Sequence, residues 1–150
     1  SWSVPMPTDV PNNNSSIAAI RLADGRICIA CNPVNADMSA DRRASLYDEL
    51  GEDDRPQATG GCTPVWGVPR GPMALAFSTD GGLSFPQRLT VEDSPGTCLS
   101  NNSEDGHNLE LSYPSLSQGP DGSLDLAYTL YRRAIKHVRL APAAFAKDRS

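Results

Sequence analysis

The chain has 150 residues, of which 39% are hydrophobic and only 6% aromatic, and it contains 13 prolines and 12 glycines. This length suits one domain, or part of one, and the proline and glycine content favours many short strands joined by turns. A formal net charge of −5 argues against binding to nucleic acid or to an anionic membrane. No run approaches the roughly 18 apolar residues of a membrane span, and the first residues lack the pattern of an export signal. The cellular compartment stays open.

The N-terminal residues 2–8 are expected to form a single outer strand. The stretch Ser1-Trp2-Ser3-Val4-Pro5 is similar to Ser84-Phe85-Pro86 further along the chain, with Trp2 in the aromatic position. We therefore expect the chain to start inside a turn motif whose first half is missing, as a fragment would.

A first hairpin is predicted over residues 16–31, where two strand-like runs flank the turn Asp24-Gly25. Cys28 and Cys31 form a CxxC in its second strand. That spacing can indicate zinc or redox chemistry. In a strand, however, residues three apart point to opposite faces, so two ordinary buried thiols are the preferred interpretation.

A long insertion follows, in which residues 39–50 are predicted to form a short helix. The segment has Ser39 as a possible N-cap, apolar residues at helical spacing, and Gly51 as a stop signal. An ordinary loop is the alternative. Cys62 and Cys98 lie in loop-like regions and are a possible disulfide in an oxidising compartment, although nothing in the sequence requires this pairing.

Residues 73–77 are expected to form a buried strand and residues 85–91 a second strand with alternating polarity. Between them, Asp80 and two glycines provide a tight reversal, in which the aspartate and Ser78 accept amide protons of the loop. The full spacing Ser78, Asp80, Gly82, Phe85 is much rarer than an Asp-Gly-Gly turn alone. It is the spacing of the Asp-box of bacterial-neuraminidase repeats.

A second hairpin is predicted over residues 113–128, which align without gaps on residues 16–31 and place Asp121-Gly122 at the turn. Residues 134–140 add a third strand. Each unit is thus a set of antiparallel strands joined by hairpins, as in a propeller blade. Residues 1–150 would then hold about two blades plus one strand of a larger propeller domain. The alternative, a complete seven-stranded β-sandwich, leaves the repeat unexplained.

The chain resembles the C-terminal part of the sialidase (neuraminidase) superfamily, in its branch of BNR/Asp-box repeat proteins. Four stretches support the resemblance over most of the chain, which corresponds to about the last third of a typical member: residues 11–25, 70–82, 111–116 and 128–138. It implies an all-β fold made of the C-terminal blades of a six-bladed β-propeller. Such a fragment alone should be inactive or should associate through its strand edges, unless the missing N-terminal blades or another chain covers them.

The resemblance also implies the site residues. Sialidases hold the substrate carboxylate with arginines, and Arg70 matches the third of these by position. They use a tyrosine nucleophile, which Tyr113 matches, and a glutamate must activate this phenol. Glu110 is a possible local substitute for that glutamate, with a solvated loop residue as its alternative reading. Tyr113 could instead be an aromatic that fills the propeller axis, and Arg70 a surface arginine.

The remaining candidates line the end of the chain. Arg132, Arg133 and His137 are expected to contact an acidic sugar, with His137 equally well explained as a hydrogen-bonded strand histidine. The chain departs from sialidases at Thr129, because they have a glutamate there that orients the first arginine. The implied activity is removal of a terminal acidic sugar, such as sialic acid, from a glycoconjugate, without cofactor or metal. A polysaccharide lyase acting on uronates and a non-catalytic sugar-binding propeller are the alternatives.

Overall fold

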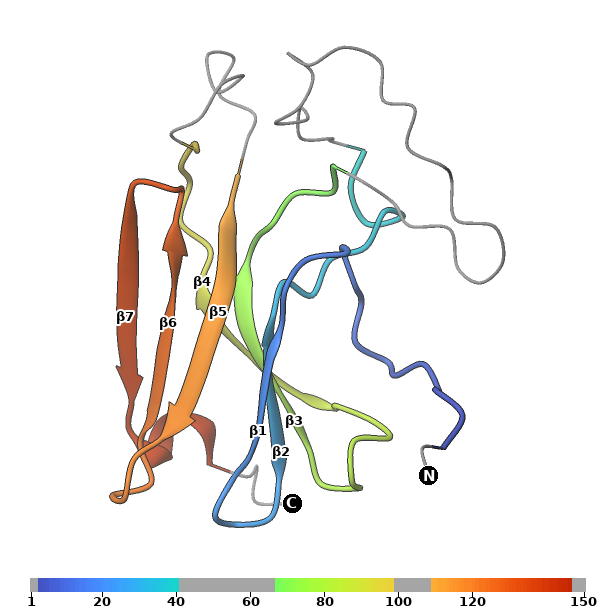
Figure 1. The fold of residues 1–150 in the computed structure, drawn as a ribbon, viewed down its shortest axis with the longest axis vertical. Helices are drawn as coiled ribbons and strands as arrows, with labels where there is room; N and C mark the ends of the chain where they lie inside the picture. The colour runs from blue at the N-terminus through green and yellow to red at the C-terminus, as the bar shows by residue number, and fades with distance from the viewer. Residues whose placement is uncertain (1–2, 41–66, 99–108, 147–150) are drawn as a thin grey trace.

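A computed structural model describes residues 3–40, 67–98 and 109–146 (Figure 1). These residues form an all-β fold of two antiparallel sheets, with one turn of 3-10 helix at Pro142–Phe145. The first sheet has the order β1-β2-β3-β4 and the second the order β5-β6-β7. The strands are β1 (Ala18–Arg21), β2 (Ile27–Cys31), β3 (Met73–Ser78), β4 (Gln87–Glu92), β5 (Leu111–Gln118), β6 (Leu124–Leu130) and β7 (Ala134–Leu140).

The two repeated segments fold as equivalent hairpins, as the ungapped alignment predicts. Arg21 pairs with Ile27 across the first turn, and Gln118 pairs with Leu124 across the second. Gly25 and Gly122 occupy the same turn position with φ of 88° and 81°, a conformation that glycine adopts without steric cost. The preceding aspartate of each turn accepts the amide proton two residues on, at 3.1 Å in both copies.

The third and fourth strands of the first sheet flank the predicted Asp-box. Every residue of β3 is buried, since this apolar strand lies between β2 and β4. At its end, the Asp80 carboxylate accepts the amide protons of Leu83 and Ser84, each at 3.0 Å, and the hydroxyl proton of Ser78 at 2.7 Å. Phe85 is buried beneath this loop. The motif therefore organises the turn chiefly through its aspartate, as its spacing predicts.

The two sheets bury a common apolar core. β1 contacts β5, and the two strands lie side by side in the centre of Figure 1. Large side chains of both sheets fill the space between them, among them Met73, Phe77, Leu111 and Tyr128. Burying such residues is the main force that holds the sheets together.

Further side-chain contacts add to this packing at two places. Glu92 of β4 accepts hydrogen bonds from Tyr128 of β6 at 3.2 Å and from Lys136 of β7. The hydrogen bonds from Lys136 and Ser94 hold the pKa of Glu92 down to about 2. At the other end, the rings of Phe77 and Phe145 stack with centroids 5.7 Å apart.

The N-terminal segment differs from its prediction, because residues 3–8 form no strand. Pro5 and Pro7 lack amide donors, which leaves this segment poorly suited to strand pairing. Asp9 instead ties the segment to the Asp-box by accepting the Phe85 amide proton at 2.8 Å. The predicted helix at 39–50 falls mostly on residues outside those described, and so does Cys62.

The structure also tests the interpretation of the CxxC. Cys28 and Cys31 are buried, unpaired thiols, and burial raises their pKa values to about 12 and about 11. Protonated, enclosed thiols are poor ligands and nucleophiles, which supports the structural interpretation of the CxxC. No helix among the described residues is long and apolar enough to cross a membrane.

Replacing Asp80 by asparagine should lower the melting temperature, because an amide has one acceptor oxygen where the carboxylate has two. Hydrogen bonds from the Ser84 side chain, the Ser84 amide and Ser78 hold the pKa of Asp80 well below its usual range. A lowered folded-state pKa stabilises the fold above the unfolded-state value of about 3.9, and this contribution is lost as pH falls. Thermal unfolding followed by circular dichroism should show a larger difference at pH 7 than at pH 3.

Asp93→Asn is the matched control, since Asp93 is exposed and no described residue donates a hydrogen bond to its carboxylate. It should leave the melting temperature unchanged. Equal melting temperatures for the Asp80→Asn variant and the wild type would contradict the role given to the Asp-box aspartate.

Candidate functional site

Two segments that are distant in sequence meet where β3 and β5 begin. Arg70 and Glu110 form a parallel β-bridge just before these strands. The Arg70 amide donates to the Leu109 carbonyl at 3.1 Å, and the Leu111 amide donates to the Arg70 carbonyl at 2.6 Å. Main-chain bonds therefore bring both predicted site residues to the same end of the two sheets.

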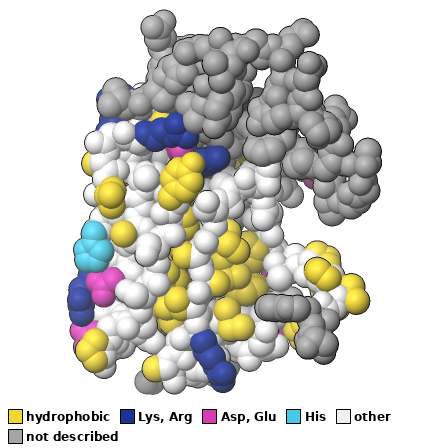
Figure 2. All heavy atoms as spheres, viewed as in Figure 1, with side chains coloured by type: hydrophobic (Ala, Val, Ile, Leu, Met, Phe, Trp, Pro, Cys, Tyr) yellow, Lys and Arg dark blue, Asp and Glu magenta, His cyan; other side chains and the backbone are white. Residues whose placement is uncertain are grey.

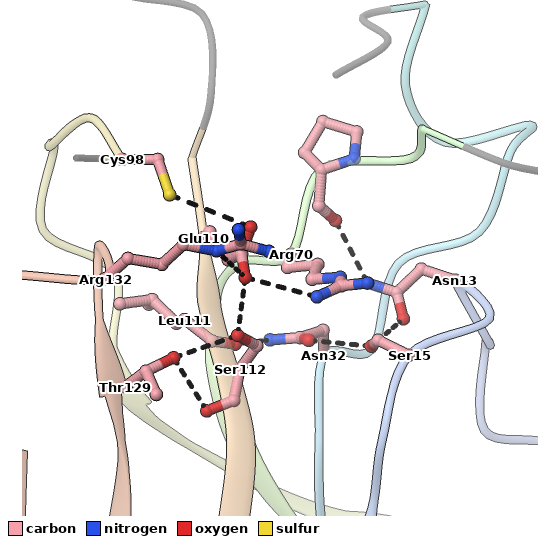
Figure 3. Close-up of polar contacts among 11 residues, drawn as sticks. Asn13, Ser15, Asn32, Arg70, Cys98, Glu110, Leu111, Ser112, Thr129 and Arg132 are labelled. Carbon is pink, nitrogen blue, oxygen red and sulfur yellow. Dashed lines mark hydrogen bonds and ion pairs between the residues drawn. The ribbon is translucent and has the colours of Figure 1, made fainter. Parts of the chain in front are cut away.

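The Glu110 carboxylate is the centre of the polar cluster in Figure 3. Arg70 donates to it through Nη1 at 3.2 Å and Arg132 through Nε at 2.9 Å. Ser112 adds a hydroxyl hydrogen bond at 2.9 Å, and the Cys98 thiol lies 3.8 Å from the second carboxylate oxygen. Glu110 is only 1% exposed, so the alternative reading of a solvated loop glutamate is wrong.

The surroundings of Glu110 keep it ionised. Burial by itself raises the pKa of a carboxyl group, because it penalises the charged form. The hydrogen bonds from Arg132 and Ser112, and the charges of both arginines, outweigh that effect and lower the pKa below its ordinary value. A carboxylate in this state accepts hydrogen bonds strongly and is a weak base.

Arg132 reaches Glu110 from a turn with unusual backbone geometry. Tyr131 and Arg132 both have positive φ, 52° and 54°, and are the two central residues of the turn in the three-residue connection between β6 and β7. The Arg133 amide closes this turn on the Leu130 carbonyl at 3.0 Å. Such turns normally use glycine or asparagine, and a bulky residue there is strained. Strain of this kind is concentrated at functional sites.

The tyrosine of this turn is held in place by its neighbours. Its amide donates to the Glu110 carbonyl at 2.9 Å, and its hydroxyl contacts the hydroxyl of Ser94 at 3.0 Å. The ring lies against Gly96, where a Cβ atom would come within 2.3 Å of a ring carbon. These contacts fix the turn from both sides and so fix the start of the Arg132 side chain.

Tyr113 lies beside this cluster in a second strained position. Its φ is 54°, and the register of β5 shifts between Ser112 and Ser115, which marks a β-bulge. The side chain is 54% exposed, and the Arg70 guanidinium lies 5.7 Å from the centre of its ring. The hydroxyl is therefore not enclosed between the sheets, and Arg70 points to the same side as the tyrosine.

Thr129 contacts the polar cluster through Ser112. Its hydroxyl lies 2.9 Å from the Ser112 hydroxyl, which in turn donates to Glu110. Glu110 therefore supplies a carboxylate to the hydrogen-bond network that Thr129 enters.

Buried amides support the segment that carries Arg70. Asn13 donates to the Pro69 carbonyl at 3.0 Å, and Asn32 donates to the Leu111 carbonyl at 2.9 Å. Ser15 connects the two amides through a 3.0 Å hydrogen bond to Asn32, as Figure 3 shows. Asn13 of the N-terminal loop and Asn32 at the end of β2 thus tie down the starts of β3 and β5.

Two predicted site residues lie apart from this cluster. Arg133 is exposed and donates through Nε to the Thr97 carbonyl at 3.0 Å. His137 is on β7, exposed, and lies 3.0 Å from a carboxylate oxygen of Asp125. Neither side chain has a hydrogen bond to Arg70, Glu110 or Tyr113, so their substrate-binding roles stay predictions.

The structure also adds contacts to the site. Ser112 was not predicted, although it lies between Glu110 and Tyr113 in the sequence. Arg132 was expected to contact an acidic sugar, and its pairing with Glu110 was not predicted. On the face shown in Figure 2, Lys and Arg side chains gather with an acidic one at the upper end of the described residues. The described residues contain no group of three or more His, Cys, Asp or Glu suited to a metal ion.

The fold and this site define an all-β protein built from repeated hairpins, with an arginine–glutamate–tyrosine cluster at one end of its two sheets. The chain belongs to the family of BNR repeat-like domains, which it matches over residues 1–126. Arg70, Glu110 and Tyr113 lie inside the matched region, and Arg132 lies just beyond it. Neither a search of curated proteins nor one of solved structures found a match.

Replacing Glu110 by glutamine should reduce the free energy of unfolding at pH 7 by about 1.5–3 kcal/mol, the usual contribution of charged hydrogen bonds. The two partly exposed arginines would lose their shared counter-charge. Because the folded-state pKa of Glu110 is lowered, its stabilisation is present above the unfolded-state value of about 4.3 and is lost as pH falls. Urea unfolding should therefore show the difference shrinking below about pH 4.

Combining Glu110→Gln with Arg132→Gln provides the control. If the two side chains act as a pair, the double variant should lose less stability than the sum of the single losses. Strict additivity at pH 7 would show that the contact contributes nothing to stability.

Proposed function

We propose that the protein is a glycosidase of sialidase type that removes a terminal acidic sugar from a glycoconjugate. The observation that carries this proposal is the cluster itself: an accessible, strained tyrosine with an arginine against its ring, inside a BNR repeat-like domain. A planar guanidinium makes paired hydrogen bonds with a sugar carboxylate. A neutral phenol is a suitable nucleophile for an anionic substrate, because it doesn't repel the substrate as a carboxylate would.

The proposal places the two sheets as consecutive blades of a six-bladed propeller. The equivalent hairpins and the side-by-side position of β1 and β5 support it. Of the described strands, β7 pairs only with β6, so the second sheet has three strands where the first has four. Further blades would complete the site and cover the open edges.

In this reaction the Tyr113 oxygen attacks the anomeric carbon, its phenol proton passes to a general base, and the bond to the leaving oxygen breaks. The leaving oxygen takes a proton from a general acid, and water then releases the sugar from the tyrosine. Arg70 binds the carboxylate and holds the tyrosine ring. The buried position and lowered pKa of Glu110 favour a role in positioning the arginines over the predicted role in activating Tyr113.

Substitution of Tyr113 by phenylalanine should lower kcat about a hundredfold or more while leaving substrate binding almost unchanged, because only the hydroxyl is removed. Arg70→Lys should instead mainly raise KM. Losing charged hydrogen bonds costs roughly 1.5–3 kcal/mol, or about 10- to 150-fold in affinity. Steady-state kinetics of the full-length protein on a sialoside test both changes. A Tyr113→Phe variant with normal kcat would rule out the nucleophile assignment.

A polysaccharide lyase is the second candidate, favoured by the threonine at position 129. In that reaction Tyr113 would abstract a proton beside the uronate carboxylate, whose charge Arg70 would neutralise. Product analysis separates the candidates: free sialic acid indicates the hydrolase, and an unsaturated uronate that absorbs ultraviolet light indicates the lyase. No product from either substrate, with retained binding, indicates a sugar-binding propeller.

A further inference from the structure

The backbone at Tyr113 has a conformation that its sequence disfavours. A φ of 54° is uncommon for a bulky residue, and the residue before a proline normally has extended backbone. Tyr113 and Pro114 also have no partner in the register between β5 and β6, where the bulge interrupts the pairing. A bulge re-aims a side chain, and the exposed Tyr113 ring lies beside the Arg70 guanidinium. A contact outside the regular strand pairing is needed to hold this conformation.

The hydroxyl of Thr129 on β6 makes such a contact. It donates a hydrogen bond to the Ser112 carbonyl at 3.1 Å. This carbonyl belongs to the planar peptide group that joins Ser112 to Tyr113, and the φ angle of Tyr113 is the rotation directly after that group. The following peptide group offers no N–H to bind, because Pro114 has none. Fixing the first peptide group is therefore the direct way to fix the φ angle of Tyr113.

The available hydroxyl hydrogens make Thr129 the donor in its contacts with Ser112. Serine and threonine hydroxyls carry one hydrogen each. Ser112 donates its hydrogen to the buried Glu110 carboxylate at 2.9 Å, so the 2.9 Å contact between the two hydroxyls uses the hydrogen of Thr129. The Thr129 hydrogen is thus shared between the two oxygens of Ser112, and Figure 3 shows this chain of contacts ending at Glu110. Valine, which has a methyl group in place of the hydroxyl, would break the chain at its first donor.

We infer that Thr129 is a positioning residue for Tyr113, whose hydroxyl holds the β5 bulge that presents the tyrosine beside Arg70. This inference rests on the proposed function, because it takes Tyr113 to be the nucleophile. Thr129 acts through the backbone of the neighbouring strand. Position 129, where sialidases have a glutamate that orients an arginine, thereby supports the tyrosine in this chain.

Steady-state kinetics of the full-length protein on a sialoside test this role in the reaction. Thr129→Val should lower kcat about ten- to a hundredfold, the effect of a small displacement of a reacting group, and should leave KM almost unchanged. Thr129→Ser retains the hydroxyl and should restore kcat. Thr90→Val is the matched control, because Thr90 is exposed on β4 and no described residue forms a hydrogen bond with its hydroxyl. This control should have the kcat of the wild type.

Fluorine NMR of the full-length protein labelled with fluorotyrosine tests the geometry without a substrate. The signal of Tyr113 is the one that disappears in the Tyr113→Phe variant. Thr129→Val should shift or split this signal, because the ring leaves its place against the Arg70 guanidinium. Thr129→Ser and Thr90→Val should leave the signal at its wild-type position. Circular dichroism confirms that each variant is folded.

The outcomes separate this inference from the proposed function. An unchanged Tyr113 signal in Thr129→Val would overturn the inference, and so would a changed signal that Thr129→Ser fails to restore. A changed signal with a normal kcat would overturn the role of Thr129 in the reaction. If the signal changes, serine restores it and the wild type cleaves no sialoside, then Thr129 positions Tyr113 and the proposed reaction is wrong.

Discussion

The buried carboxylate of Glu110 is the contact on which the described site depends. Three separate parts of the chain converge on it: the segment before β3, the start of β5 and the turn after β6. A carboxylate has two acceptor oxygens and a full negative charge, whereas the amide of a glutamine has one acceptor oxygen and no charge. Without the carboxylate, two guanidinium cations would share a partly buried region with no counter-charge between them, which would destabilise this end of the two sheets.

Most of the fold could be predicted from the sequence, because its hairpins depend on local chemistry. Asp24-Gly25 and Asp121-Gly122 each reverse the chain in a way that few other pairs allow, so the alignment of the two repeats carries the strand register with it. The turn of the Asp-box also depends on local chemistry, since the hydrogen bonds of Asp80 are made with near neighbours in the sequence. Residues 3–8 were mispredicted because similarity to another outer strand outweighed the missing donors of two prolines.

The site was predictable only in part. Arg70, Glu110 and Tyr113 were identified through resemblance to sialidases. These residues come together because of a β-bridge between Arg70 and Glu110, which no local sequence pattern predicts. The Arg132 contact was harder to anticipate, because Tyr131 and Arg132 have none of the residue preferences of the turn they form. Turn propensity describes the backbone conformation that a segment prefers when it has no tertiary contacts. Here the tertiary contacts of Tyr131 override that preference.

The β6–β7 turn has a consequence for protein engineering. Consensus or stability-driven redesign would replace Tyr131 and Arg132 with asparagine and glycine, because both positions have positive φ. Such a change would relieve backbone strain, but it would also remove the buried Tyr131 ring and the guanidinium that faces Glu110. A redesign guided by backbone preference alone would therefore weaken the side-chain contacts that join the two sheets at this end.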